Sequence, residues 1–443
     1  MTTRPGQHPG VATTAPSWTD VGAMQLELLR AQLDWVARRS PFYARRFAAA
    51  GFRPDSIVRS EDLQQLPFTT KPELHANQAS HPPMGDFACV SIREVSRVYS
   101  STGTLGHPTR VGLTVSDRTG WTTVANRVLQ IVGMRSEDVV VTGMAYGQFT
   151  GGLPISEAID SIGAAQIPGG TGSPASIIGA IRDFQASFLI CSPSFAFYLA
   201  EYAEEKMELN PAKIGVRRIL LGAEGGADLK GVRDAVATRF DAATTSAFGS
   251  ADLMPIYAGA CEQDRGEHLL APDHLYLELV DPQTGEPMPW EDGAEGELVG
   301  THLRRECTPL VRFRTRDIVR INAQPCPCGR PGPRITCVGR TDDVFHVDGR
   351  AIYAAELRAV VASQLGRTTG MVEVVVLDRP APGRERVSVR VEYGMYVEDL
   401  GELRRDLGTT IEQHFGVSLH IDLLPPGSLP RYDRKAVLIR RIP

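Results

Sequence analysis

The spacing of apolar residues divides the chain into a helical beginning, an alternating middle and a compact end. Leu29, Leu33 and Val36 recur at helical spacing, and short helical patterns interrupted by Pro and Gly follow them. The first 17 residues hold mostly Thr, Gly, Pro and other small residues with no apolar period. We therefore expect a disordered tail over residues 1–17 and ordered structure after it.

In the middle of the chain, short β-rich runs alternate with helical patterns from about residue 98 to 222. Runs such as 139–141 and 188–191 predict strands, and a stretch such as 176–184 predicts a helix between strands. This alternation indicates an α/β fold with a sheet covered by helices. A further β-rich section follows over residues 275–301.

The end of the chain changes character again after Gly339. The pattern predicts helices at 354–364 and 398–415 and strands at 372–377 and 387–393. About a hundred residues of this kind make a compact α+β domain. We therefore expect a large domain over residues 18–341 and a small one over 342–443.

Composition narrows the class of protein. The 443 residues carry 47 Lys and Arg against 52 Asp and Glu, a net charge of −5, so nothing favours nucleic acid or an anionic membrane as a partner. The sequence has no signal peptide pattern and no run near the roughly 20 apolar residues that span a bilayer, which predicts a cytoplasmic protein. Seven cysteines, an odd number, argue against a secreted disulfide framework and leave metal binding or burial.

Residues 100–109 form a loop rich in small and hydroxyl-bearing residues, SSTGTLGHPT, directly after a β-rich run. Small residues allow the backbone to approach an anion, and hydroxyl and amide groups donate hydrogen bonds to phosphate oxygens. The loop lacks the Gly-Lys-Ser/Thr ending of a nucleotide P-loop. Taken alone, the segment fits an ordinary flexible turn equally well.

The 100–109 loop and seven further ordered blocks, spread over nearly the whole chain, resemble one known family. The 100–109 loop is similar to the phosphate loop of the adenylate-forming superfamily, in the version found in phenylacetate-coenzyme A ligases. The other blocks are PFY at 41–43, LPFTTK at 66–71, YGQFTGG at 146–152, GAE at 222–224, FRTRD at 313–317, GRTDD at 339–343, and PR at 430–431 before Lys435. The resemblance implies a large N-terminal α/β domain with helix-covered sheets and a small, mobile C-terminal α+β domain.

The same resemblance implies an activity. ATP and Mg²⁺ adenylate a carboxylic acid, an aromatic one in the related ligases, and coenzyme A then takes the acyl group. One alternative is a stand-alone biosynthetic adenylating enzyme that delivers the acyl group to a carrier protein or an amine. A second is a nucleotide-binding protein that has lost turnover. A homodimer is compatible with each.

By resemblance, a set of loop and strand residues should hold the nucleotide. Phe248 replaces the family's usual Tyr as the face that stacks on adenine, and Asp317 should accept hydrogen bonds from both ribose hydroxyls. Without the family context, Asp317 would be interpreted as a residue that forms a surface salt bridge. The full set is Ser101, Thr102, Gly103, Thr104, Gly106, Gly222, Ala223, Glu224, Phe248, Gly249, Asp317 and Arg340.

The catalytic residues follow from the same resemblance. Lys435 should contact the α-phosphate and the acyl oxygen, where an ammonium stabilises the negatively charged transition state. Asp342 stands at the hinge between the two domains, and Asp252 should be the magnesium ligand. Tyr146, Phe149 and Gly151 should line the acid pocket, although aromatic rings are also common in ordinary cores.

The pattern departs from the family at three positions. His107 replaces a lysine in the phosphate loop, and an imidazole of ordinary pKa is mostly uncharged at neutral pH. Asp252 replaces a glutamate and so presents its carboxylate on a shorter arm, and Arg434 stands where Gly is frequent. These changes motivate the alternative of lost turnover, and equally a retuned substrate or acceptor.

Four residues have the chemistry of a zinc site. Cys326 and Cys328 lie one residue apart in a tight turn, and Cys261 precedes His268 in another segment. Three sulfurs and one imidazole meet the tetrahedral demand of structural zinc, and some phenylacetate-coenzyme A ligase relatives carry a similar arrangement. Reduced, buried cysteines without a metal are the alternative.

Overall fold

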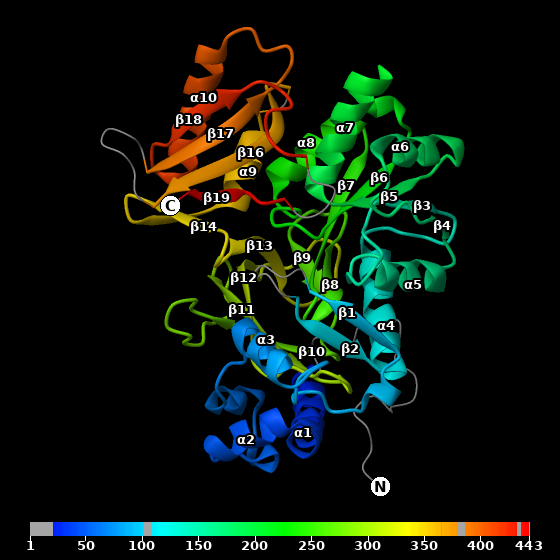
Figure 1. The fold of residues 1–443 in the computed structure, drawn as a ribbon, viewed down its shortest axis with the longest axis vertical. Coiled ribbons are helices and arrows are strands. Elements are labelled where there is room, and N and C mark those ends of the chain that lie inside the picture. Colours follow the sequence, from blue (N-terminus) through cyan, green and yellow to red (C-terminus); the bar gives the residue numbers. More distant parts are fainter. Residues whose placement is uncertain (1–20, 102–107, 365, 379–385, 432–435, 443) are drawn as a thin grey trace.

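The computed structural model describes residues 21–101, 108–364, 366–378, 386–431 and 436–442. Figure 1 shows a large unit (residues 21–340) and, beside one end of it, a C-terminal unit (residues 344–442). The predicted tail, Thr102, Gly103, Thr104, Gly106, His107, Arg434 and Lys435 lie outside the described residues. The predicted domain boundary at 341/342 falls between the last strand of the large unit and the first of the C-terminal unit.

Helices open the large unit. Leu29, Leu33 and Val36 are fully buried on the first of them, which confirms the helix that their spacing predicts. The helices are α1 (Val21–Arg39), α2 (Pro41–Ala49) and α3 (Lys71–Ser80), joined by the short 3-10 helices η1 (Pro54–Ser56) and η2 (Ser60–Gln65). In Figure 1 they lie at the end of the molecule opposite the C-terminal unit.

A capping box fixes the start of α3. The Thr70 N–H donates a hydrogen bond to the Glu73 carboxylate at 2.8 Å, and the Thr70 hydroxyl donates to the same oxygen. This arrangement satisfies amides that the first helical turn would otherwise leave unpaired. It places Lys71 at the first position of the helix, beside the cavity described below.

One half of the main sheet is parallel and confirms the α/β class. Its strands lie in the order β7-β6-β5-β3-β4, with bounds β3 (Val139–Thr142), β4 (Ala165–Ile167), β5 (Phe188–Cys191), β6 (Arg218–Leu221) and β7 (Ala243–Ser250). One face packs on α6 (Pro174–Asp183), α7 (Pro193–Met207) and α8 (Lys230–Phe240), and η4 (Pro211–Lys213) follows α7. The other face packs on α4 (Val115–Ile131) and α5 (Leu153–Ile162).

The other half of the same sheet is antiparallel. It continues from β7 through β8 (Met254–Ala260), β9 (Glu267–Leu269), β13 (Arg334–Arg340), β12 (Phe313–Asn322), β11 (Glu295–His302) and β10 (Leu275–Val280). Strand β7 joins the halves, because its residues 243–246 pair with β6 and its later residues pair with β8. The β-rich section predicted over 275–301 therefore extends an 11-stranded sheet instead of forming a separate one.

A hairpin brings the predicted phosphate loop to the large unit. Strand β1 (Arg97–Ser100), which follows η3 (Ile92–Glu94), pairs antiparallel with β2 (Arg110–Leu113). Ser100 lies opposite Arg110, so residues 101–109 connect the two strands. The described ends of the loop are tied together, since the Ser101 and Thr109 hydroxyls are 2.7 Å apart.

The C-terminal unit is a four-stranded sheet packed on helices, in the order β18-β17-β16-β19. Its elements are β14 (Val344–Val347), β15 (Arg350–Tyr353), α9 (Ala354–Ala362), β16 (Thr368–Leu377), β17 (Val387–Tyr393), α10 (Leu400–Phe415), β18 (His420–Leu424) and β19 (Ile439–Ile442). The predicted strands and helices of this region correspond to β16, β17, α9 and α10. In the described part of the chain, no helix has both the length and the apolar character needed to cross a membrane.

Candidate active site

A cavity of about 290 Å³ lies at the carboxyl ends of the parallel strands. Gly143 follows β3, Ser192 follows β5 and Gly222 follows β6, and all three line the cavity together with the last residues of β7. The cavity therefore sits where the parallel half of the sheet meets the antiparallel half. Crevices at such positions are the usual ligand sites of α/β sheets.

One wall of the cavity is apolar. Ile155 of α5, Ile190 of β5, Leu220 of β6 and Ala247 of β7 line it, and all four also belong to the core that packs on α4 and α5. Met144 and Phe149, two of the residues between β3 and α5, line the cavity as well. This wall offers hydrocarbon surface against which a ligand can pack.

The predicted nucleotide residues that the structure describes all line this same cavity. They come from five separate parts of the chain: Ser101, Gly222, Ala223, Glu224, Phe248, Gly249, Asp317 and Arg340. The structure thus brings together residues that are up to about 240 positions apart in the sequence (Ser101 to Arg340).

Asp317 and Arg340 form a pair on adjacent strands. Arg340 Nη1 donates to Asp317 Oδ1 at 2.6 Å, and Arg340 Nε donates to Asp342 Oδ1 at 2.9 Å. Burial alone would lower the pKa of Arg340, but the Asp317 and Asp342 carboxylates outweigh burial and raise it. The arginine is therefore a permanent cation that orients an ionised Asp317 at the cavity.

Gly249 permits the bend at which β7 enters the cavity wall. The pairing of β7 with β8 shifts register between Phe248 and Ser250. A Cβ atom at Gly249 would lie 2.1 Å from the Pro255 carbonyl oxygen, so only glycine fits. Phe248 is held edge-on against Tyr257, with ring centroids 5.4 Å apart, and lines the cavity.

Asp252 lies at the cavity with both carboxylate oxygens engaged. Lys71 Nζ is 2.5 Å from Oδ2, and the Thr109 hydroxyl donates to Oδ1 at 3.1 Å. Carboxylates are the type of ligand with which Mg²⁺ binds nucleotides. Asp252 therefore has the chemistry to hold such an ion at the cavity.

The three predicted acid-pocket residues differ in position. Phe149 and Gly151 line the cavity. Tyr146 is not among the described residues that line it; its hydroxyl instead joins a polar group with Thr142 at 2.7 Å, Gln166 at 3.0 Å and Ser156 at 3.1 Å. These hydrogen bonds tie Tyr146 to β3, β4 and α5.

Ala436, the residue after Lys435, contacts the cavity wall, and Arg431, four residues before Lys435, contacts the large unit elsewhere. The Ala436 N–H donates to Glu224 Oε1 at 3.3 Å, and Glu224 is part of the cavity wall. Arg431 pairs with Glu201 of α7 in the large unit and with Glu392 of β17 in the C-terminal unit. The chain on both sides of Lys435 therefore contacts the large unit.

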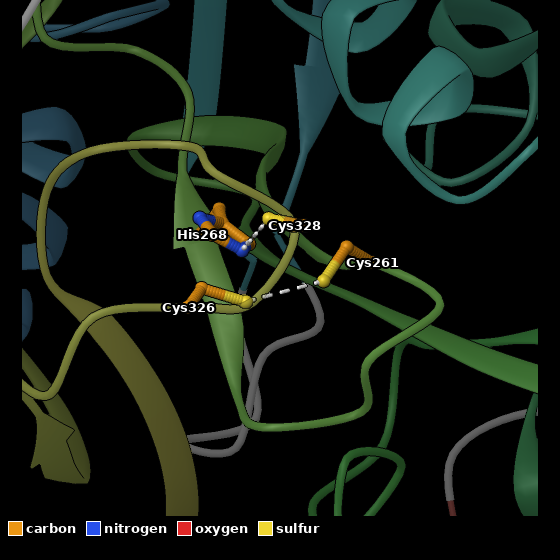
Figure 2. A group of neighbouring side chains, drawn as sticks. All are labelled: Cys261, His268, Cys326 and Cys328. Atoms are coloured by element: carbon orange, nitrogen blue, oxygen red, sulfur yellow. Dashed lines mark hydrogen bonds between the residues drawn. The ribbon is translucent and has the colours of Figure 1, made fainter.

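Figure 2 shows the four predicted zinc ligands converging from three segments. Cys261 follows β8, His268 lies in β9, and Cys326 and Cys328 lie in the turn before β13. The Cys261 and Cys326 sulfurs are 3.6 Å apart, Cys328 Sγ lies 3.5 Å from His268 Nε2, and all four ligand atoms lie within 4.8 Å of one another. Tetrahedral zinc with bonds of about 2.3 Å separates its sulfurs by about 3.8 Å, so the residues fit the metal.

The protonation of the cluster also suits a cation. Burial, reinforced by nearby Arg334 and Arg330, lowers the pKa of His268 to about 4, so its imidazole is neutral at pH 7 and has a free lone pair. Burial raises the pKa of Cys261 to about 12, so a metal bound there would have to displace the thiol proton. None of the four residues lines the active-site cavity.

Several cavity residues were not identified from the sequence. Ile155, Ile190 and Leu220 carry no motif, and their apolar character predicts only burial. Lys71 is the last residue of the family block at 66–71, and its place in that block could have identified it as a cavity residue. Asp228, just beyond the 222–224 block, also lines the cavity; burial raises its pKa to about 6.

No family model matches the chain. The chain does match curated relatives. A phenylacetate-coenzyme A ligase of Thermus thermophilus is 32% identical over 429 residues, covering 93% of this chain and 94% of the relative. A phenylacetate-coenzyme A ligase of Pseudomonas putida is 33% identical over 419 residues, covering 93% and 92%.

Solved structures agree with this and also bear on the arrangement of the two units. A 2-hydroxyisobutyryl-CoA ligase in the postadenylation state with 2-HIB-AMP has a TM-score of 0.89 at 26% identity, covering 99% of this chain and 94% of that one. The same ligase in the thioesterification state with 2-HIB-AMP and CoA has a TM-score of 0.70 at 26% identity, covering 98% and 94%. The present arrangement is therefore closer to the postadenylation one. With relatives above 30% identity along nearly their whole length, the chain belongs to the phenylacetate-coenzyme A ligase family of adenylate-forming enzymes.

Proposed function

We propose that the chain is an AMP-forming acid–coenzyme A ligase that takes an aromatic carboxylic acid. The observation that carries the proposal is the shared cavity: an apolar wall and the family's nucleotide residues meet in one space at the carboxyl ends of the strands. An acid bound against the wall and ATP bound against Asp317 and Phe248 would have their reacting groups side by side. Such positioning is the main contribution of a protein to phosphoryl chemistry.

In the first step, a carboxylate oxygen attacks the α-phosphorus of ATP. The new bond forms the acyl-adenylate, the bond to the β-phosphate breaks, and pyrophosphate leaves. Asp317 would hold the ribose and Arg340 would orient Asp317, whereas Lys435 would stabilise charge on the α-phosphate and the acyl oxygen. Mg²⁺ held at Asp252 would neutralise phosphate charge when bound.

In the second step, the thiol of coenzyme A attacks the acyl carbon, the thioester forms and AMP leaves. The family's two steps use different positions of the small domain, and Asp342 is the proposed hinge. The Asp342 side chain pairs with Arg340 and Arg316 in the present arrangement. A carrier protein in place of coenzyme A is the alternative acceptor.

The apolar wall supports, as the substrate, an aromatic acid with no charge besides its carboxylate. Among the described residues that form it, Met144, Ile155, Ile190 and Leu220 present only hydrocarbon or thioether surface. An aromatic ring gains from burial on such a surface, whereas a second charge would lose its hydration without a partner. Phenylacetate is the acid named for the curated relatives.

A panel of acids in the ATP–pyrophosphate exchange assay tests the proposal. We expect exchange with aryl and arylacetic acids, and at least about tenfold weaker exchange with dicarboxylic or hydroxy acids of similar size. Product mass with coenzyme A, and then with carrier proteins, identifies the acceptor. Exchange with aliphatic acids alone would contradict the aromatic assignment, and no exchange with any acid would favour a binding protein without turnover.

We also propose that Cys261, His268, Cys326 and Cys328 hold a structural zinc ion. Four protein ligands fill the coordination shell, which is typical of structural sites. The ion would join the end of β8, β9 and the turn before β13 into one rigid corner. It would have no part in the reaction.

Metal analysis of protein purified under reductant should therefore find about one zinc ion per chain. Removing it with a chelator should lower the melting temperature by about 5 °C, and added zinc should restore it. Cys328→Ser should abolish zinc binding, whereas Cys89→Ala, outside the cluster, should retain the metal. Protein purified without zinc, or protein whose zinc can be removed with no change in melting temperature, would contradict the site.

A further inference from the structure

Helix α8 of the large unit and helix α9 of the C-terminal unit approach each other very closely. A Cβ atom at Gly231 of α8 would lie 2.2 Å from the carbonyl oxygen of Ala359 and 2.9 Å from its carbonyl carbon. Both atoms belong to the α9 backbone, which cannot turn aside as a side chain can. In this arrangement of the two units, only glycine fits at position 231.

A buried ion pair crosses the same contact. Arg358 Nη1 of α9 lies 3.1 Å from Glu224 Oε2, and both side chains are only 3% exposed. The same Nη1 donates to the Ser194 hydroxyl at 3.0 Å, and Nη2 donates to the Gly225 carbonyl at 3.3 Å. The Ser194 hydroxyl in turn donates to Glu224 at 2.8 Å.

The carboxylate in this pair also belongs to the active-site cavity. Glu224 lines the cavity, and its other oxygen accepts the N–H of Ala436, the residue after Lys435. Residues of the C-terminal unit thus contact a residue of the cavity wall. Arg358 itself is not among the described residues that line the cavity, so it acts there through Glu224 and Gly225, which do line it.

We propose that Arg358, Glu224, Ser194 and Gly231 form a latch that selects the arrangement in which the acid is adenylated, and that this latch opens before the thiol attacks. The proposal rests on the two-step function proposed above. The TM-scores of 0.89 and 0.70 support it, because the arrangement that contains these contacts is closer to the postadenylation structure than to the thioesterification structure.

The charge of Arg358 contributes to the latch only while the two units are together. While the units are together, Arg358 neutralises a carboxylate that is only 3% exposed, and removing one partner of such a pair penalises the buried state strongly. When the units rotate apart, both charges regain water, and the loss of Arg358 has little effect. Arg358 is therefore a positioning residue for the first step.

Measuring the two half-reactions separately tests the latch. Adenylation is followed by ATP–pyrophosphate exchange, and thioester formation is followed with coenzyme A and a chemically prepared acyl-adenylate. For Arg358→Ala we expect the maximal exchange rate to fall about 30-fold or more, and thioester formation from supplied adenylate to stay within about threefold of wild type. Arg358→Lys keeps the charge and should restore part of the exchange rate.

Gly231→Ala tests the latch without altering any charge. Alanine stabilises an isolated helix relative to glycine, so slower adenylation would not reflect a weaker α8. The added methyl group should keep α9 away and lower the maximal exchange rate about tenfold, again with thioester formation nearly unchanged. Gly179→Ala is the matched control, because Gly179 lies in helix α6 and a Cβ atom there would meet no atom beyond its own stretch of helix within 4 Å. It should leave both half-reactions unchanged.

The possible outcomes separate the latch from the proposed function. Wild-type protein without exchange on any acid would overturn the proposed function and the latch with it. Wild-type exchange, combined with variants that slow both half-reactions equally, would overturn the latch alone. A higher KM for ATP at an unchanged maximal exchange rate would likewise overturn it, by assigning Arg358 to nucleotide binding.

Discussion

Replacing Lys435 with alanine should slow acyl-adenylate formation by about 10²- to 10³-fold. The ammonium group is expected to stabilise charge on the α-phosphate and the acyl oxygen, and alanine has nothing to offer there. Thioester formation from supplied acyl-adenylate should stay close to wild type, because this charge develops in the first step. Single-turnover measurements of pyrophosphate release and of thioester formation would report the two steps separately.

The neighbours of Lys435 support this expectation. Ala436 donates to Glu224 at the cavity wall, and Arg431 joins the large unit through Glu201. Lys213→Ala, which removes an exposed lysine outside the cavity wall, is the control for a general effect of lost positive charge. If Lys435→Ala formed the adenylate as fast as the control, the role that the family resemblance assigns to Lys435 would be wrong.

Replacing Asp317 with asparagine should lower kcat/KM for ATP by about 100-fold. Two hydrogen bonds from ribose hydroxyls to an ionised carboxylate are worth about 1.5–3 kcal/mol each, and a neutral amide retains only part of that. A factor of 100 corresponds to about 2.7 kcal/mol, within the range of losing the charge on both bonds. The loss should appear mainly in KM for ATP.

A second substrate makes the assignment of Asp317 specific. Wild-type protein should use 2′-deoxy-ATP about tenfold or more less well than ATP, whereas Asp317→Asn should discriminate much less between the two. Asp273→Asn is the matched control, because Asp273 forms a buried pair with Arg127, at 2.7 Å, outside the cavity wall. It should weaken folding and keep the wild-type preference for ATP. Unchanged discrimination in Asp317→Asn would place the ribose elsewhere.

Local elements of the fold were predictable from the sequence, but the way the sheet is assembled was not. The apolar periods of α1, β5 and α10 appear in the sequence because each element buries one face or lies wholly in the core. The pairing of β7 with β6 on one side and with β8 on the other is a non-local property. It carries no periodic signal, so the sheet appeared in the sequence as two separate sections.

The residues of the candidate site were likewise predictable only in part. Asp317, Phe248 and Arg340 could be named because they stand in motifs of the resembling family, and they do line one cavity. Ile155 and Leu220 look like ordinary core residues, because a ligand-binding wall and a packed core use the same side chains. Arg358 was not predicted at all, since its partner Glu224 is 134 positions away and nothing local marks the pair.

The proposed zinc site affects how the protein should be handled. Without a metal, the Cys261 and Cys326 sulfurs lie 3.6 Å apart, and a disulfide requires about 2.05 Å, a small movement of two side chains. In air, dissolved oxygen can take two electrons and two protons from these thiols, which leaves a disulfide where two metal ligands stood. Such protein would not bind zinc until a reductant cleaved the disulfide. A preparation stored in air would therefore be indistinguishable from a protein that never held the ion.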